Sequence, residues 1–161
     1  MEKTQDALGL AELFQRYEKM VDRNSGVKAE LRRVAEPQDL LDKPSFYRLM
    51  AGKGTGEGWQ QVVFFLPYVK HKSGADSLGR LLAKAKISEM RLFQVLRSNA
   101  PNDLVQLRRL VQQIEPSLDW ETFGKSLYWW TKSASPKQKI LQDYFLATTP
   151  EDKTKTQGSP K

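Results

Sequence analysis

The sequence predicts an all-α fold of about eight to nine helices, and three observations support this prediction. Apolar residues recur three and four positions apart along nearly the whole chain, which is the spacing of one helix face. Alternating or β-branched runs, which are typical of strands, are scarce. Helix-capping residues, prolines and glycines divide the apolar pattern into short segments. At 161 residues, the chain suits one compact domain or two small helical lobes.

Four helices are expected in the N-terminal half, each with an apolar stripe and a stop signal. They run from Asp6 to Val21, between Ser25 and Pro37, from Pro44 to Met50, and from Trp59 to about Tyr68. Ser25 is expected to cap the second of them. The glycine-rich stretch 52–58 lacks the spacing and the preceding strand of a phosphate-binding loop, so we interpret it as a flexible linker.

Five further helices are expected after a polar, basic loop at 70–76. Their caps or first residues are Ser77, Ser88, Asp103, Asp119 and Ser135. Asp103 and Gln106 have the spacing of a capping box. The polar tail 149–161 is expected to be disordered because it has too few apolar residues to pack.

Two adjacent tryptophans lie in the helix expected from Trp120 to Thr131. Helical spacing places Trp130 with the apolar stripe, which assigns it to the core. Trp129 is open to two interpretations, a packed side chain or a surface on which bases stack.

The positive charge is concentrated in one part of the chain. The formal charge is +7, and residues 68–109 hold nine Lys and Arg against three Asp and Glu, whereas 1–50, 51–67 and 110–150 each balance. The nine cations are Lys70, Lys72, Arg80, Lys84, Lys86, Arg91, Arg97, Arg108 and Arg109. Cations on successive outer helix faces can neutralise phosphates without reading bases, which predicts salt-sensitive, sequence-tolerant binding. The alternative interpretation is an ordinary solvated surface.

Enzyme chemistry is not expected, and neither is a metal, a cofactor or a small-molecule substrate. The chain has no cysteine and one histidine, His71, which lies between two lysines and is interpreted as an exposed loop residue. Zinc sites and catalytic triads need several such groups held by one another. The acidic residues are interpreted as scattered caps and solvated positions, among them Asp6, Asp42, Asp103 and Asp119.

The expected location is the cytoplasm. The absence of cysteine fits a reducing compartment. The first residues are polar and no apolar run approaches the roughly 20 residues of a membrane span, so neither a signal peptide nor a transmembrane helix is expected.

Seven groups of residues, taken in order, resemble one known family. They are Leu31-Arg32-Arg33-Val34-Ala35-Glu36-Pro37, Pro44-Ser45-Phe46-Tyr47-Arg48-Leu49, Ser77-Leu78-Gly79-Arg80, Arg91-Leu92-Phe93-Gln94, Val105-Gln106-Leu107-Arg108-Arg109-Leu110, Glu115-Pro116 with Leu118-Asp119-Trp120, and Trp129-Trp130. The chain resembles the CasB family, the small subunits of type I-E CRISPR Cascade surveillance complexes. The resemblance extends from about Ala7 to Thr149. The glycines between Lys53 and Trp59 depart from it.

The resemblance implies a non-catalytic, two-lobed helical subunit, for which we expect lobes at 1–76 and 77–148. It implies as partners the large and backbone Cascade subunits, a second copy of the chain, CRISPR RNA and target DNA. Its implied task is to hold the displaced DNA strand along a basic groove and so to stabilise the R-loop.

The resemblance also implies which residues bind nucleic acid. Four arginines match its motifs and are the first candidates: Arg33, Arg91, Arg108 and Arg109. Weaker candidates are Arg32, Arg48, Arg80 and Arg97. Composition and position alone support Lys70, Lys72 and Lys132.

Two other classes of protein remain open from the sequence. A helix-turn-helix regulator is also small, helical and basic, and its recognition helix would be Asp103–Ile114. A hydrolase would require an acidic cluster with metal-dependent activity, for which the sequence gives little support.

Overall fold

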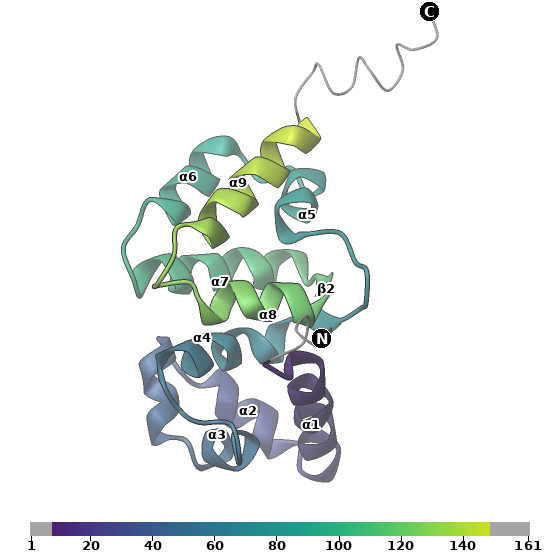
Figure 1. Cartoon of the computed structure of the whole chain (residues 1–161), viewed down its shortest axis with the longest axis vertical. Coiled ribbons are helices and arrows are strands. Elements are labelled where there is room, and N and C mark those ends of the chain that lie inside the picture. Colours follow the sequence, from purple (N-terminus) through teal and green to yellow (C-terminus); the bar gives the residue numbers. More distant parts are fainter. Residues whose placement is uncertain (1–7, 149–161) are drawn as a thin grey trace, which may run out of the picture.

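The computed structural model describes residues 8–148, and over this range the chain is helical, as predicted. Figure 1 shows the arrangement. The helices are α1 (Leu10–Arg23), α2 (Gly26–Arg32), α3 (Pro44–Leu49), α4 (Glu57–Phe65), α5 (Leu78–Lys84), α6 (Glu89–Leu96), α7 (Asn102–Ile114), α8 (Trp120–Tyr128) and α9 (Ser135–Thr148). The chain also contains short 3-10 helices, η2 (Pro37–Asp42) and η3 (Leu66–Tyr68). The tail from residue 149 and the expected start at Asp6 lie outside the described residues.

Helix α4 lies in the middle of the molecule and is apolar on all sides. Its residues Trp59, Val62, Val63, Phe64 and Phe65 are all buried. It packs against η2 on one side and α8 on the other, and α1 also packs on α8 (Figure 1). A helix that is apolar all round is stable only when neighbours cover it. The glycine-rich stretch before α4 was predicted as a linker, and most of it is a turn and loop.

The C-terminal helices form two closely packed pairs, α5 with α9 and α6 with α7. The first pair approaches closely at Gly79, where an added Cβ would lie 2.8 Å from the Asp143 Cβ. Buried side chains from α1 to α9 form one continuous apolar cluster. The division into lobes at residue 76 stays a prediction.

A two-residue parallel pairing joins the two halves, which the sequence did not predict. Lys70–His71 (β1) pairs with Ser117–Leu118 (β2). The Trp120 backbone N–H donates to His71 Nδ1 over 3.1 Å, and the Trp120 indole Nε1–H donates to the Val69 carbonyl oxygen over 3.1 Å. The expectation that His71 is an exposed loop residue is therefore wrong, because the ring is half-buried and accepts a hydrogen bond at the start of α8.

Three of the predicted caps are confirmed. The Ser77 and Ser88 hydroxyls accept from the Arg80 and Arg91 backbone N–H groups, and the Asp119 carboxylate accepts from the Glu121 N–H.

Two predicted caps are wrong. Ser25 makes no side-chain cap hydrogen bond. Asp103 lies inside α7 and is buried, where its Oδ2 accepts from Trp130 Nε1 over 2.9 Å and pairs with Lys137 Nζ over 2.8 Å. The capping-box spacing was misleading here because Asp103 Oδ2 is bound by residues far along the chain, Trp130 after α8 and Lys137 on α9.

Candidate nucleic-acid interface

Helix α7 places Arg109 on its exposed face, as its apolar stripe predicted. Its buried residues Leu104, Leu107, Leu110 and Val111 face the core, and this turns Arg109 outward into solvent. Within the described chain, the Arg109 side chain has no hydrogen bond or ion pair.

Helix α6 brings a second arginine to the same face of α7. Gln113 lies one helical turn from Arg109 and therefore on the same face. Its Oε1 accepts a hydrogen bond from Arg91 Nη1 over 2.9 Å. Arg91 stays exposed, and the amide that holds it is neutral and therefore does not offset its positive charge.

Arg108 occupies a different environment from its neighbour. It is half-buried, and its Nη1 donates to the Val34 carbonyl oxygen over 2.9 Å. Its guanidinium carbon lies 4.1 Å from the centre of the Phe64 ring and 5.6 Å from that of Tyr68. Burial lowers the pKa of Arg108, but an arginine remains protonated at any physiological pH. Arg108 therefore joins α7 to the N-terminal helices and adds charge to the surface without a free guanidinium.

The ring of Tyr68 lies close to two cations at once. The guanidinium carbon of Arg32, at the end of α2, is 5.1 Å from the ring centre. Arg108 approaches the same ring, and both distances lie within the range of a cation–π interaction. Tyr68 thus places the end of α2 beside the outer face of α7.

A groove of about 790 Å³ runs beside these residues, and it is the larger of two adjoining grooves. Its basic lining residues are Lys28, Arg32 and Lys70, and Gln112 of α7 contributes to the same wall. Its acidic lining residues are Glu18 and Asp22 of α1 and Glu115 at the end of α7, so the charges of the lining balance. Gln112 lies three residues after Arg109 on α7, so Arg109 lies on the helix face that borders this groove.

The second groove, of about 570 Å³, shares Glu115, Pro116 and Ser117 with the first. Lys72 and Lys84 line it. Lys84 Nζ lies 2.6 Å from Asp76 Oδ2, and the Arg80 Nε lies 3.8 Å from Asp76 Oδ1. The hydrogen bond and the charge of Lys84 lower the pKa of Asp76, so this carboxylate is ionised and neutralises part of the second groove.

The structure therefore brings together five of the eleven predicted binding residues, which we call the α7 cluster: Arg32, Lys70, Arg91, Arg108 and Arg109. Two others lie next to it. Arg33 is exposed at the end of α2, beside the Val34 whose carbonyl holds Arg108, and Lys72 follows β1.

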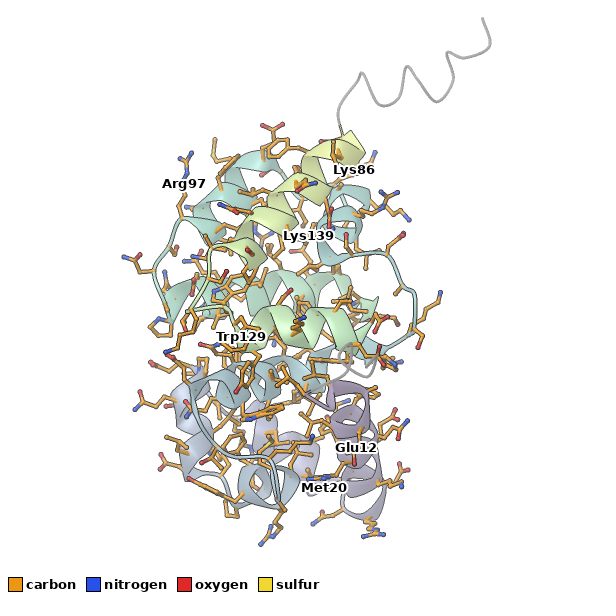
Figure 2. All side chains as sticks on the ribbon, in the orientation of Figure 1. Glu12, Met20, Lys86, Arg97, Trp129 and Lys139 are labelled. Carbon is orange, nitrogen blue, oxygen red and sulfur yellow. The ribbon has the colours of Figure 1, made fainter. Side chains whose placement is uncertain are left out.

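The remaining predicted residues lie elsewhere. Arg48 is exposed on α3, and Arg80 is paired with Asp76. Arg97 ends α6 and its guanidinium carbon lies 4.7 Å from the Phe93 ring centre, well away from α8 and α4 (Figure 2). Lys132 is exposed after α8.

Between residues 8 and 148, no group of three or more histidine, cysteine or acidic side chains could hold a metal ion. In the same range no helix has the length and apolar character required to cross a membrane.

Comparison with known proteins identifies the family. The family model for the CRISPR-associated protein Cse2 matches residues 27–145. This chain belongs to the Cse2 family. The matched region contains the whole α7 cluster, and also both grooves apart from the walls that α1 supplies.

A curated relative and a solved structure are similar to this chain over almost their full length. The CRISPR system Cascade subunit CasB of Escherichia coli strain K12 is 36% identical over 159 residues, covering 89% of this chain and 94% of the relative. A chain in the crystal structure of E. coli Cascade bound to a PAM-containing double-stranded DNA target superimposes with a TM-score of 0.73 at 34% identity, covering 86% of this chain and 97% of that chain.

Sequence reasoning missed three parts of this Cse2-family surface. Lys28 lies in a segment whose charges balance, so composition gave no signal for it. Tyr68 was interpreted only as the end of a helix, and its position between two arginines depends on the packing of α2 against η3. Gln113 has no charge, although it anchors Arg91.

Proposed function

We propose that this Cse2-family chain is the non-catalytic small subunit of a Cascade surveillance complex. In this role it binds the displaced, non-target DNA strand through the α7 cluster and stabilises the R-loop. The family match and the likeness to the E. coli Cascade subunit support membership of such a complex. The large and backbone subunits, a second copy of the chain and CRISPR RNA are its proposed partners.

One observation supports the binding surface more than any other. Within the described residues, Arg32, Lys70, Arg91 and Arg109 are exposed and have no carboxylate partner. Arg91 is held by a neutral amide and Arg32 lies over a neutral ring. Their positive charge is therefore available to a polyanion, and phosphate neutralisation releases counterions, which favours binding.

A surface of this kind suits a strand of any sequence. Contacts to phosphates position a nucleic acid without reading its bases. Forming the RNA–DNA duplex costs about as much as it returns, because it replaces a DNA duplex of similar stability. Modest contacts to the displaced strand are therefore enough to shift the equilibrium towards the open state.

The same contacts favour the subunit over a helix-turn-helix regulator. Arg108 is committed to Val34 and Gln113 to Arg91, so part of the polar face of α7 is already bound within the chain. A recognition helix needs such side chains free to reach base edges.

The proposal is tested in the assembled complex by measuring target opening and strand binding against salt. The double variant Arg91→Glu with Arg109→Glu should lower affinity for all sequences alike and reduce the salt slope by about 1.4, from about 0.7 for each single-strand phosphate contact. The matched control is Arg48→Glu with Arg97→Glu, which makes the same charge change outside the α7 cluster. Equal loss in both double variants would show that total charge, and not the α7 cluster, binds the strand.

A further inference from the structure

Trp129 differs from the other three tryptophans because it is exposed. Its side chain is 45% exposed, whereas Trp59, Trp120 and Trp130 are between 0% and 7% exposed. The indole N–H groups of Trp120 and Trp130 donate to Val69 and Asp103 inside the chain. Figure 2 shows Trp129 at the end of α8 on the near face of the molecule. Nothing in the proposed α7 cluster uses it.

The ring is nevertheless held in place from beneath. The centre of the Trp129 ring lies 5.0 Å from that of Tyr128, and the Tyr128 ring lies 5.0 Å from that of buried Trp59, both in edge-to-face geometry. Gly58 permits this contact, because a Cβ there would lie 2.7 Å from the Tyr128 ring. This series of rings restricts the motion of Trp129, so little conformational entropy would be lost when a ligand stacks on it.

Two lysines lie about one turn before and one turn after Trp129 along the backbone. The Trp129 N–H donates to the Lys125 carbonyl oxygen over 3.1 Å, and the Lys132 N–H donates to the Trp129 carbonyl oxygen over 3.0 Å. Both lysine side chains are exposed, and between residues 8 and 148 neither has an ion-pair partner.

The charge balance of residues 110–150 conceals this local excess. Two other lysines of that segment, Lys137 and Lys139, are paired with Asp103 and Asp143 at 2.8 Å. The carboxylate of Glu57 accepts from Thr131 Oγ1 over 3.1 Å, and Glu121 precedes Lys125 by one turn of α8. Trp129 is therefore an exposed aromatic side chain close in sequence to two exposed lysines that form no ion pair among the described residues.

We infer that Trp129 is a stacking surface for an unpaired base of single-stranded nucleic acid, with Lys125 and Lys132 contacting the adjacent phosphates. An aromatic ring beside cations is the usual arrangement for sequence-tolerant single-strand binding, because every base has a π-face. The inference rests on the proposed function for its ligand. It adds a second site, because Trp129 lies at the end of α8 and is among neither the residues of the α7 cluster nor the lining of the large groove.

A protein-docking surface would look different. Interface cores are rich in aromatic residues but depleted in lysine. Around Trp129 the exposed neighbours are polar or small, namely Lys125, Thr131, Lys132, Ser133 and Ala134. One exposed ring in such surroundings provides too little apolar area for a protein interface, but it provides enough for one base to stack on it.

The test compares two single-stranded oligodeoxynucleotides of equal length and charge, one of mixed sequence and one fully abasic, binding to the full chain at low salt. Trp129→Ala should weaken binding of the mixed-sequence strand about tenfold and leave binding of the abasic strand unchanged. Trp129→Tyr should restore most of the loss. The mixed strand should also quench tryptophan fluorescence in the wild type and not in Trp129→Phe, since the other tryptophans are buried.

Tyr47→Ala is the matched control, because Tyr47 is also 45% exposed but lies on α3. It should change neither affinity. A wild-type chain that binds both strands equally, or neither, would overturn the inference, as would a Trp129→Ala variant with intact strand binding but impaired assembly with partner subunits. In that last case Trp129 contacts protein. Loss of strand binding in the Arg91 and Arg109 variant with no effect at Trp129 would leave the proposed function standing alone.

Discussion

The α7 cluster and the α5–α9 pair contain the same kinds of residue but use their cations differently. On the α5–α9 side, Lys84 is bound to Asp76, Lys137 to Asp103 and Lys139 to Asp143. In the α7 cluster, the arginines contact neutral groups, namely an amide, a backbone carbonyl and aromatic rings. Net charge therefore does not identify a binding surface. The position of the carboxylates decides which cations remain available.

The largest expected effect on stability concerns the ion pair between the buried Asp103 and Lys137. Asp103→Asn removes the charge that compensates Lys137 and replaces the carboxylate that accepts from Trp130 Nε1, and we expect a loss of about 3 kcal/mol in the free energy of unfolding, since an ion pair with a buried carboxylate is broken on one side only. Urea denaturation measures it. Asp76→Asn is the control, because its ion pairs are exposed and should contribute nothing measurable. Equal effects of the two substitutions would show that burial does not distinguish these pairs.

The close approach of α5 and α9 gives the next effect. Gly79→Ala places a Cβ 2.8 Å from the Asp143 Cβ and 3.0 Å from the Tyr144 nitrogen, so the helices must separate. We expect a loss of about 2 kcal/mol, typical of overpacking. Gly56→Ala serves as the control, because nothing lies within 4 Å of its added Cβ. A stable Gly79→Ala variant would mean that this helix pair can shift freely.

Arg108 and Arg109 separate packing from binding within the α7 cluster. Arg108→Met should cost about 1.5 kcal/mol of stability, because it removes a hydrogen bond and a cation–π contact. Its effect on strand binding should be small. Arg109→Met should leave the unfolding midpoint unchanged and weaken strand binding. Thermal unfolding and strand binding, measured on both variants, would contradict this assignment if the two effects were exchanged.

The smallest expected effect concerns the carboxylate of Glu30, which is held by hydrogen bonds from Ser45. Hydrogen bonds from the Ser45 hydroxyl and N–H to Glu30 lower the pKa of Glu30 below 4.5, with minor help from Arg48. A lowered folded-state pKa stabilises the fold above the unfolded pKa, and this contribution is lost as pH falls through the folded value. Ser45→Ala should therefore cost about 1 kcal/mol at pH 7, and less at pH 3, where the carboxyl is protonated. A cost that is independent of pH would exclude this linkage.

Local signals in the sequence were sufficient for most helices. Ser77, Ser88 and Asp119 begin helices because their side chains accept hydrogen bonds from N–H groups two or three residues ahead, which depends on nothing distant. The same rule was wrong for Asp103, whose Oδ2 is bound by Trp130 and Lys137, both far along the chain. The two-residue strands are too short to leave a periodic pattern.

Local signals likewise predicted only part of the candidate site. Exposure of Arg91 and Arg109 follows from the apolar stripes of their own helices. The half-burial of Arg108 depends on Phe64 and Val34, which lie far away in the chain. No spacing rule within α7 could indicate these contacts.

Helix α8 fixes the distance between the two places where this chain presents aromatic and basic groups. Ser117, which lines both grooves, lies three residues before its first residue, and Trp129 immediately follows it. Its nine residues span about 13 Å at 1.5 Å per residue. A single inserted residue would turn Trp129 by about 100° about the helix axis. The length of α8 is therefore constrained by geometry, independently of which residues fill its buried face.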